Sequence, residues 1–298
     1  MSIQSAKINI NGTDYTLTYN SISGKYEATI TAPGSTSYNL TNHYYNCSVT
    51  ATNTAGTSTT VTGDTLSGLR LVVHETVKPV ITITSPTSGA YVTNNKQPVV
   101  FTVVDESGGS GINIGSLVVK QDGIATTAYT TTAITNGYSV TYTPTTALTD
   151  GSHTVTVDIS DNDGNAAVQK TTTYTVDTVA PTLNVTNPAN NLVTNSASLT
   201  VSGTTNDATS SPVSVTIKLN GTDQGSVTVT GGAFSKAITL ATGSNTILVT
   251  ATDAAGRSST VTRTVTLDTT SPQITAVTIT PNPADTGASM VVSVTITG

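Results

Sequence analysis

The chain has 298 residues, of which only 9% are charged, and its formal net charge is −6 at pH 7. An acidic balance argues against a nucleic-acid partner, which requires clustered Lys and Arg, and the scarcity of ionisable groups argues against a catalytic globule. No apolar run reaches about 18 residues, so the sequence predicts no membrane insertion.

A short phrase occurs three times, at residues 49–56, 157–164 and 249–256. Each copy alternates apolar and small polar residues, turns at Asn/Asp-x-x-Gly and continues into a second alternating stretch, which predicts a β-hairpin. The last two copies are spaced by about one immunoglobulin-type sandwich. No segment has a sustained helical period, so we expect almost no helix.

Prolines mark three junctions, at Pro79, Pro181 and Pro272. Each follows a short linker and fixes φ before the next strand begins. We therefore expect an all-β chain of tandem immunoglobulin-like β-sandwiches in a semi-rigid rod, with a C-terminal partial repeat of two strands. The predicted sandwiches cover residues 1–77, 78–178 and 179–270, and the incomplete repeat covers residues 271–298.

The expected strands follow from alternation. In the first sandwich they cover residues 6–10, 15–19, 26–31, 47–52 and 69–73. In the second they cover residues 80–84, 99–103, 117–120, 138–142, 154–159 and 171–176. In the third they cover residues 183–186, 198–202, 213–219, 225–229, 233–239, 245–250 and 258–267. The third sandwich has the clearest inward face, formed by Val213, Val215, Ile217 and Leu219.

The last 28 residues reproduce only the opening of a further repeat, with strand-like runs at 274–279 and 290–296. Two strands cannot close a sandwich, and alone they expose apolar faces and open edges. One interpretation is that the tail packs on the third sandwich or that the sequence was cut. The other is that strand addition from another copy or another protein completes it. The predicted interface residues are Ile274, Val292, Val294 and Ile296.

The turn Asp161–Gly164 resembles the start of a calcium loop, although no bidentate Glu follows it. Asp177, at a junction, adds a further oxygen, so Asp161, Asp163 and Asp177 are candidate calcium ligands. The alternative is an ordinary hairpin turn. The equivalent turn at Asp253 has a single carboxylate, which favours this alternative. We therefore expect no cofactor, with calcium as the less favoured option.

No residues suggest catalysis. Asp105 and Glu106 are adjacent carboxylates before a Gly-rich loop, and a solvated loop explains them better than acid–base chemistry. The histidines have no metal-like spacing, and no Ser is paired with a His and an acid. They are His43, His74 and His153. We predict that the chain is not an enzyme and has no catalytic residues.

The aromatic side chains are most concentrated at Tyr38, Tyr44 and Tyr45. Tyr combines apolar area with a polar tip, so this cluster is a candidate surface for binding sugar or protein. Packing within the domain is the alternative, and Tyr45 has the position of a tyrosine corner before Cys47. Cys47, the one cysteine, is interpreted as a buried thiol that fills core volume.

Residues 249–256 and the following stretch up to Pro272 resemble bacterial immunoglobulin-like (Big-type) repeats, and this resemblance covers residues 78–298. Such repeats are spacer and adhesive modules of surface proteins, surface enzymes and phage virions. Residues 15–20 and 24–33 are similar to the N-terminal part of tandem Ig-like proteins of phages and prophages of Firmicutes, which also end shortly after a stretch like Thr280–Pro283. The resemblance implies the fold and transfers no catalytic residue.

The leading hypothesis is a non-enzymatic phage structural protein that is associated with the tail or capsid. Its expected partners are other virion proteins or copies of itself, and weak binding to carbohydrate of the host surface is a further option. The first ten residues have no signal-peptide pattern, which favours a virion protein made in the host cytoplasm. The alternatives are a spacer or adhesin region of a secreted bacterial surface protein, and accessory carbohydrate-binding modules. The last is weaker because the chain has no Trp.

Overall fold

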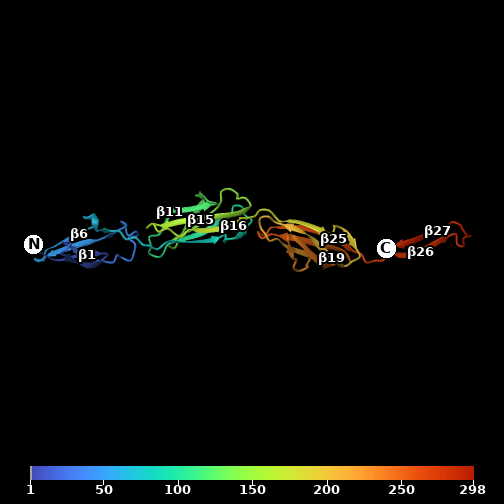
Figure 1. The fold of residues 1–298 in the computed structure, drawn as a ribbon, viewed down its shortest axis with the longest axis horizontal. Helices are drawn as coiled ribbons and strands as arrows, with labels where there is room; N and C mark the ends of the chain where they lie inside the picture. The colour runs from blue at the N-terminus through green and yellow to red at the C-terminus, as the bar shows by residue number, and fades with distance from the viewer. Residues whose placement is uncertain (1) are drawn as a thin grey trace. The chain divides into compact units, whose positions relative to one another are not determined.

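A computed structural model describes residues 2–298 and shows strands throughout, with no α-helix in that range (Figure 1). One 3-10 turn, η1 (Ser67–Leu69), is the sole helical element among these residues. The expected all-β class and the tandem Ig-like sandwiches are confirmed. The chain divides into two compact units, Met1–Val176 and Asp177–Gly298, which are described separately. No helix within residues 2–298 is long and apolar enough to cross a membrane.

The first segment of the chain forms one five-stranded sheet and a small two-stranded one. Asn11 and Gly12 both have positive φ, as a two-residue hairpin turn requires. The large sheet has the order β3-β2-β1-β5-β6, from strands β1 (Ile3–Ile10), β2 (Thr13–Asn20), β3 (Lys25–Glu27), β5 (Ser48–Asn53) and β6 (Ser58–Thr62). The small sheet pairs β4 (Tyr45–Asn46) with β7 (Arg70–Leu71).

The core of this first segment is small. The buried members of its core cluster are Ile10, Tyr45 and Cys47, so the expected burial of the thiol is confirmed. Strands predicted at 26–31 and 69–73 are reduced to β3 and β7. In the second of these, residue 69 belongs to η1, and residues 72 and 73 lie outside any strand.

The second sandwich packs two sheets face to face. One sheet has the order β13-β14-β10-β8, from strands β8 (Val80–Ser85), β10 (Val99–Val104), β13 (Tyr129–Ile134) and β14 (Gly137–Tyr142). The other has the order β12-β11-β15-β16-β9, from strands β9 (Ala90–Val92), β11 (Ile112–Gln121), β12 (Ile124–Thr126), β15 (Gly151–Asp161) and β16 (Lys170–Val176). Alternating residues of both sheets meet in one core around Phe101 and Tyr174.

The third sandwich repeats this plan. One sheet has the order β17-β19-β23-β22, from strands β17 (Thr182–Asn187), β19 (Ser198–Asn206), β22 (Val229–Thr230) and β23 (Ala233–Thr239). The other has the order β18-β25-β24-β20-β21, from strands β18 (Leu192–Thr194), β20 (Ser214–Leu219), β21 (Thr222–Asp223), β24 (Gly243–Thr252) and β25 (Ser258–Leu267). The predicted inward face is confirmed, since all four of its residues are buried.

Gly203 explains how the core of the third sandwich accommodates its single Phe. A Cβ atom at Gly203 would lie 2.2 Å from the Asn184 carbonyl oxygen and 2.7 Å from Phe234 Cζ. A side chain at this position on β19 would therefore collide with the neighbouring strand and with the ring.

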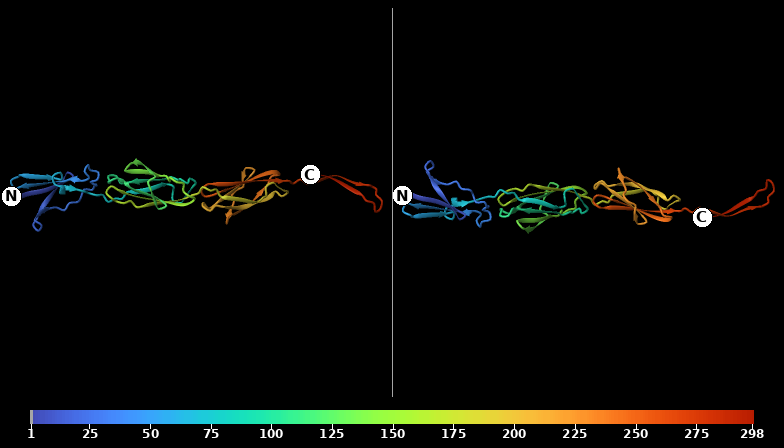
Figure 2. Two further views of the ribbon diagram at one scale, coloured as in Figure 1. Left: turned by 90° about the horizontal axis from the view of Figure 1, so that it is seen from above. Right: turned by 90° about the horizontal axis from the view of Figure 1, so that it is seen from below.

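In both sandwiches the chain changes sheets near its start. β8 pairs antiparallel with β10, whereas β9, a few residues later, pairs parallel with the last strand, β16. β17 and β18 divide in the same way, with β18 parallel to β25. Figure 2 shows the resulting two layers in each sandwich.

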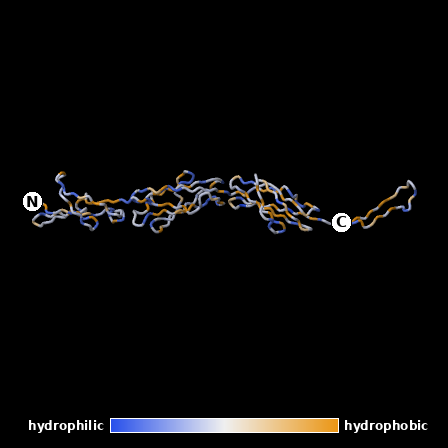
Figure 3. The backbone as a smooth tube through the Cα atoms, turned by 60° about the horizontal axis from the view of Figure 1, so that its bottom comes forward, coloured by the Kyte–Doolittle hydropathy of each residue, from blue (hydrophilic) through white to orange (hydrophobic). Residues whose placement is uncertain are grey.

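The C-terminal segment is an isolated antiparallel hairpin of β26 (Gln273–Thr280) and β27 (Val291–Thr297). Every residue of both strands is exposed, so the tail does not pack on the third sandwich. Register and alternation place three apolar cross-strand pairs on one face, called here the hairpin face. These pairs are Ile274–Ile296, Val277–Val294 and Ile279–Val292. Much of both strands is hydrophobic in Figure 3.

Candidate functional site

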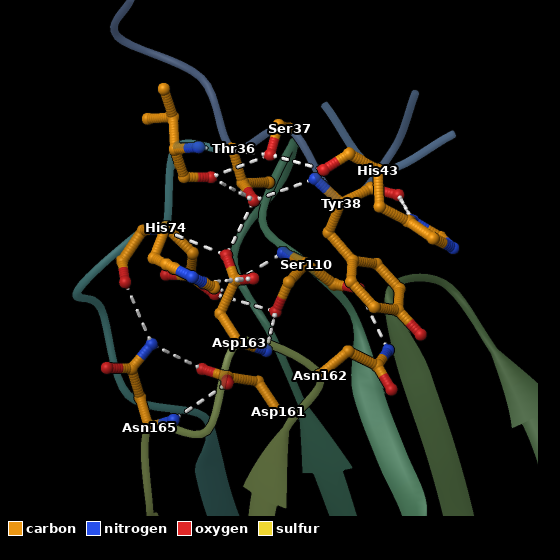
Figure 4. Close-up of polar contacts among 12 residues, drawn as sticks. Thr36, Ser37, Tyr38, His43, His74, Ser110, Asp161, Asn162, Asp163 and Asn165 are labelled. Carbon is orange, nitrogen blue, oxygen red and sulfur yellow. Dashed lines mark hydrogen bonds and ion pairs between the residues drawn. The ribbon is translucent and has the colours of Figure 1, made fainter. Parts of the chain in front are cut away.

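Asp163, in the hairpin turn after β15, is the centre of a polar network between the first and second sandwiches (Figure 4). Its Oδ2 accepts hydrogen bonds from the Thr36 hydroxyl (2.5 Å) and from the backbone N–H of Glu75 (3.0 Å). Its Oδ1 lies 2.9 Å from His74 Nδ1. Burial raises the pKa of the Asp163 carboxyl, but these bonds outweigh burial and hold it below its usual value. The carboxylate therefore acts as an ionised anchor for the first sandwich.

Beside this network lies an acidic cluster of Glu75, Asp105 and Glu106. Each contributes one carboxylate oxygen, and these oxygens lie within 4.8 Å of one another. Asp105 Oδ1 and Glu106 Oε2 are buried without a hydrogen-bond partner. Burial, together with hydrogen bonding to Glu75 and Asp105, raises the pKa of Glu106 to about 7. A proton shared within this cluster relieves the repulsion between its carboxylates near neutral pH.

A second acidic cluster lies within the third sandwich and its leading linker. Asp177 precedes β17, Asp207 follows β19 and Asp253 follows β24, and one carboxylate oxygen from each lies within 4.8 Å of the others. Asp177 is fully buried and Asp253 is 6% exposed. Because such groups are rarely buried unless they are paired, this cluster is the strongest candidate metal centre of the chain.

Local hydrogen bonds orient all three carboxylates of this cluster. Asp177 accepts from the Val179 N–H and the Ser210 hydroxyl. Asp207 Oδ1 accepts from the N–H groups of Thr209 (2.8 Å) and Ser210 (2.7 Å). Asp253 Oδ1 accepts from the Arg257 N–H at 2.9 Å, whereas Asp253 Oδ2 is buried with no hydrogen-bond partner.

Of this cluster, only Asp177 was predicted as a calcium ligand from the sequence. Asp177 meets Asp207 and Asp253. The two oxygens of Asp161 accept hydrogen bonds from the backbone and side chain of Asn165, and those of Asp163 are bonded as described above. Calcium binding by Asp161, Asp163 and Asp177 together stays a prediction.

A signal for the missed residues was present in the repeats. The linker acid stands four residues before the junction Pro, as Glu75 and as Asp177. Asp105 directly follows β10, and Asp207 directly follows the equivalent strand β19. Asp161 and Asp253 have equivalent positions in the hairpin turns after β15 and β24. Alignment of the repeats by their strands would have brought these positions together.

The histidines make structural contacts. His153, 8% exposed, lies 2.7 Å from Asp122 Oδ2 through Nδ1 and 2.8 Å from the Thr149 carbonyl through Nε2. Both partners accept hydrogen bonds, so both ring nitrogens donate and the imidazolium form is favoured. Burial opposes this charge, but the two bonds raise the pKa of His153 above its usual value.

The three tyrosines point to packing more than to a platform for sugars. Tyr45 is buried and donates to the Ser35 carbonyl at 3.0 Å. The rings of Tyr38 and His43 are stacked, with centroids 4.4 Å apart. The Arg70 guanidinium lies 5.1 Å from the centroid of the Tyr44 ring. A surface-binding role for these residues stays a prediction.

Two family models match parts of the chain. Residues 79–178 match a bacterial Ig-like domain, and residues 181–269 match domain B of glucodextranase. The second and third sandwiches are therefore similar to these modules in sequence as well as in fold. None of the curated proteins compared with the chain matches it.

Several solved structures are similar to parts of the chain at low identity. Fibronectin(III)-like modules of Clostridium thermocellum CbhA are 17% identical, with a TM-score of 0.42, over 63% of this chain and 94% of theirs. The glucan-utilisation protein SGBP-B of Bacteroides ovatus, solved with a mixed-linkage heptasaccharide, is 14% identical over 96% of this chain and 69% of its own, with a TM-score of 0.22. Drosophila OTK extracellular domains 3–5 are 10% identical over 89% and 86%, with a TM-score of 0.31.

Proposed function

We propose that this chain is a non-enzymatic structural protein of a phage virion, in which the Ig-like sandwiches are exposed modules and the C-terminal hairpin attaches the chain to its partner. The observation that carries this proposal is the hairpin face, whose six apolar side chains are all exposed. The partner is another virion protein or another copy of the chain, which contributes strands that cover this face.

The complete sandwiches support this role for the hairpin. In the second sandwich, β8 and β10 form the same kind of antiparallel pair, with Ile81 opposite Val103 and Ile83 opposite Phe101. There the opposing sheet buries Ile81, Phe101 and Val103. Burial of each exposed side chain of the hairpin face would contribute roughly 1.5–3 kcal/mol. A two-stranded hairpin alone is marginally stable in water, so association would also stabilise it.

The side-chain chemistry supports a structural role. Among residues 2–298 the buried Asp and His side chains are held in the acidic clusters, in the contacts of Asp161 and Asp163 described above, or in the His153–Asp122 pair. None of these contacts places a Ser or Cys side chain beside a His base that an acid orients. Ig-like modules generally serve as spacers and binding units. The resemblance of residues 1–77 to phage and prophage proteins favours the virion over the bacterial surface.

The test is incorporation into particles. Phage particles from a strain encoding the full chain should contain it at fixed stoichiometry, as measured by quantitative mass spectrometry. A chain without residues 271–298 should fold, by circular dichroism and melting, but should be missing from the particles. Absence of the full chain from purified particles, or normal incorporation of the truncated chain, would refute the proposal.

A second candidate function is a spacer region of a bacterial surface or secreted protein. The match of residues 79–178 to a bacterial Ig-like domain and that of residues 181–269 to domain B of glucodextranase favour it. Fractionation of the producing cells separates the two: recovery of the chain from the cell wall or medium of a strain that releases no particles supports this candidate and contradicts the first.

A further inference from the structure

We propose that Asp177, Asp207 and Asp253 bind one calcium ion at the end of the third sandwich. This inference is independent of the proposed virion role. It rests on the geometry of the cluster and on one buried oxygen within it.

The cluster concentrates negative charge where water is largely excluded. Three carboxylate oxygens lie within 4.8 Å of one another, and two of the residues, Asp177 and Asp253, are more than nine-tenths buried. Like charges at this separation repel, and burial removes the solvent that would screen them. A divalent cation between the three oxygens turns this repulsion into attraction.

Asp253 Oδ2 is the second observation that points to a ligand. It is buried and has no hydrogen-bond partner, although Oδ1 of the same carboxylate accepts from the Arg257 N–H. Coordination of a cation would satisfy this oxygen.

The donor set selects calcium among the common divalent cations. All three ligands are carboxylates, and the cluster contains no His or Cys, which zinc prefers. Calcium accepts six to eight oxygens in irregular arrangements, from carboxylates, carbonyls and water, whereas magnesium demands a near-ideal octahedron. The hydrogen bonds from Val179, Thr209 and Ser210 hold the carboxylates in place before the ion arrives.

The acidic cluster of the second sandwich is a different case. Its members include the adjacent residues Asp105 and Glu106, and Glu106 has a pKa of about 7. Protonation of Glu106 therefore relieves the repulsion between the carboxylates of that cluster. Asp161 has the position in the second sandwich that Asp253 has in the third. Both of its carboxylate oxygens accept hydrogen bonds from Asn165. The proposal is confined to the third sandwich for these reasons.

The test is a calcium titration of the metal-stripped, ¹⁵N-labelled full chain, followed by NMR. We expect calcium to shift the amide signals of Val179, Thr209, Ser210 and Arg257, and magnesium at the same concentration to shift them much less. Asp253→Asn and Asp207→Asn retain the oxygen that accepts the local hydrogen bonds, and each should weaken calcium binding tenfold or more. The control is Asp223→Asn, an exposed acid of the same sandwich, which should bind calcium like the wild type.

Three results would overturn the proposal. The first is the absence of shifts at these amides up to about 10 mM calcium, which exceeds the range of weak extracellular modules. The second is an unchanged titration in Asp253→Asn, with a well-dispersed spectrum that proves folding. The third is a protonated Asp253 carboxyl, seen in its ¹³C chemical shift at neutral pH, that calcium does not displace.

Discussion

The hydroxyl of Thr36 donates a hydrogen bond of 2.5 Å to Asp163 Oδ2, although 127 residues separate the two in sequence. The same carboxylate accepts from the Glu75 N–H and lies beside His74. Its side chain is 3% exposed. One ionised group of the second sandwich thus holds two separate stretches of the first, whose own core cluster is small.

The first prediction is that Asp163→Ala destabilises the first sandwich. Loss of a buried carboxylate with charge-assisted hydrogen bonds should cost roughly 1.5–3 kcal/mol. Hydrogen exchange should accelerate at residues 36–38 and 73–75, and urea unfolding should show an earlier transition. The control is Asp158→Ala, because the Asp158 carboxylate accepts its hydrogen bonds from Gln169 within the second sandwich and not from the first. Equal exchange rates in both variants would contradict the anchoring role.

The second prediction concerns Glu106. Burial and its carboxylate neighbours raise its pKa to about 7, above the usual 4.5. A carboxyl group whose pKa is raised on folding stabilises the folded chain at pH values below the pKa of the same group in the unfolded chain. This contribution is lost as pH rises from about 4.5 through 7. Glu106→Gln should therefore lose less stability than the wild type between pH 4.5 and pH 7. At pH 8 its melting temperature should be higher than that of the wild type. A variant whose melting curve follows the wild type from pH 5 to pH 8 would show that Glu106 ionises normally.

The third prediction concerns His153. Its pKa is raised despite burial, by the bonds to Thr149 and Asp122, so its stabilising contribution is complete below the unfolded pKa of about 6.5 and is lost as pH rises through the folded value. The pKa of Asp122 is lowered: burial opposes the shift, but the bonds to His153 and Thr154 outweigh it. The stabilising contribution of the ionised Asp122 is therefore complete above the unfolded pKa of about 4 and is lost as pH falls from there through the lower folded pKa.

His153→Gln tests this pair. It should destabilise the second sandwich by about 1–3 kcal/mol at pH 5.5, and the difference from wild type should shrink at pH 8.5. Calorimetry of both proteins at pH 5.5 and pH 8.5 measures this difference in stability. A direct reading comes from the His153 ring signals in NMR, and a titration midpoint below 6.5 would disprove the imidazolium assignment.

The fourth prediction concerns the hairpin face. Val294→Thr keeps the volume and the β-branched shape but places a hydroxyl in the centre of the face, opposite Val277. It should weaken association of the chain with particles or with itself at least tenfold. The matched control is Ser293→Thr, one residue away on the opposite face of the hairpin. Sedimentation and particle incorporation measure both, and equal losses in the two variants would exclude a face-specific contact.

The strands were predictable because alternation and turn chemistry are local properties. Val213, Val215, Ile217 and Leu219 were recognised as an inward face from their period of two, and all are buried. The hairpin turns were readable for the same reason, since Asn11-Gly12 supplies the positive φ values that its turn needs.

The acidic cluster of the third sandwich was not predictable in this way. Asp177, Asp207 and Asp253 lie in a linker, after a strand and in a turn, and each alone has an ordinary explanation there. The single carboxylate in the turn at Asp253 favoured an ordinary hairpin turn over a calcium site. What makes the cluster is the sandwich topology, which brings the linker, the end of β19 and the turn after β24 to one end of the domain. Burial of Asp253 is likewise a tertiary property.

The parallel pairing of β9 with β16 has a mechanical consequence. Tension applied to the two ends of the second sandwich pulls β9 backwards and β16 forwards, so the strands are loaded in shear. The paired residues Ala90–Val92 and Tyr174–Val176 then bear the load together, because their hydrogen bonds lie across the direction of the pull. β18 and β25 give the third sandwich the same resistance. Strands loaded in shear separate only when several hydrogen bonds break at once, so this pairing opposes extension of the chain between β9 and β16 and between β18 and β25.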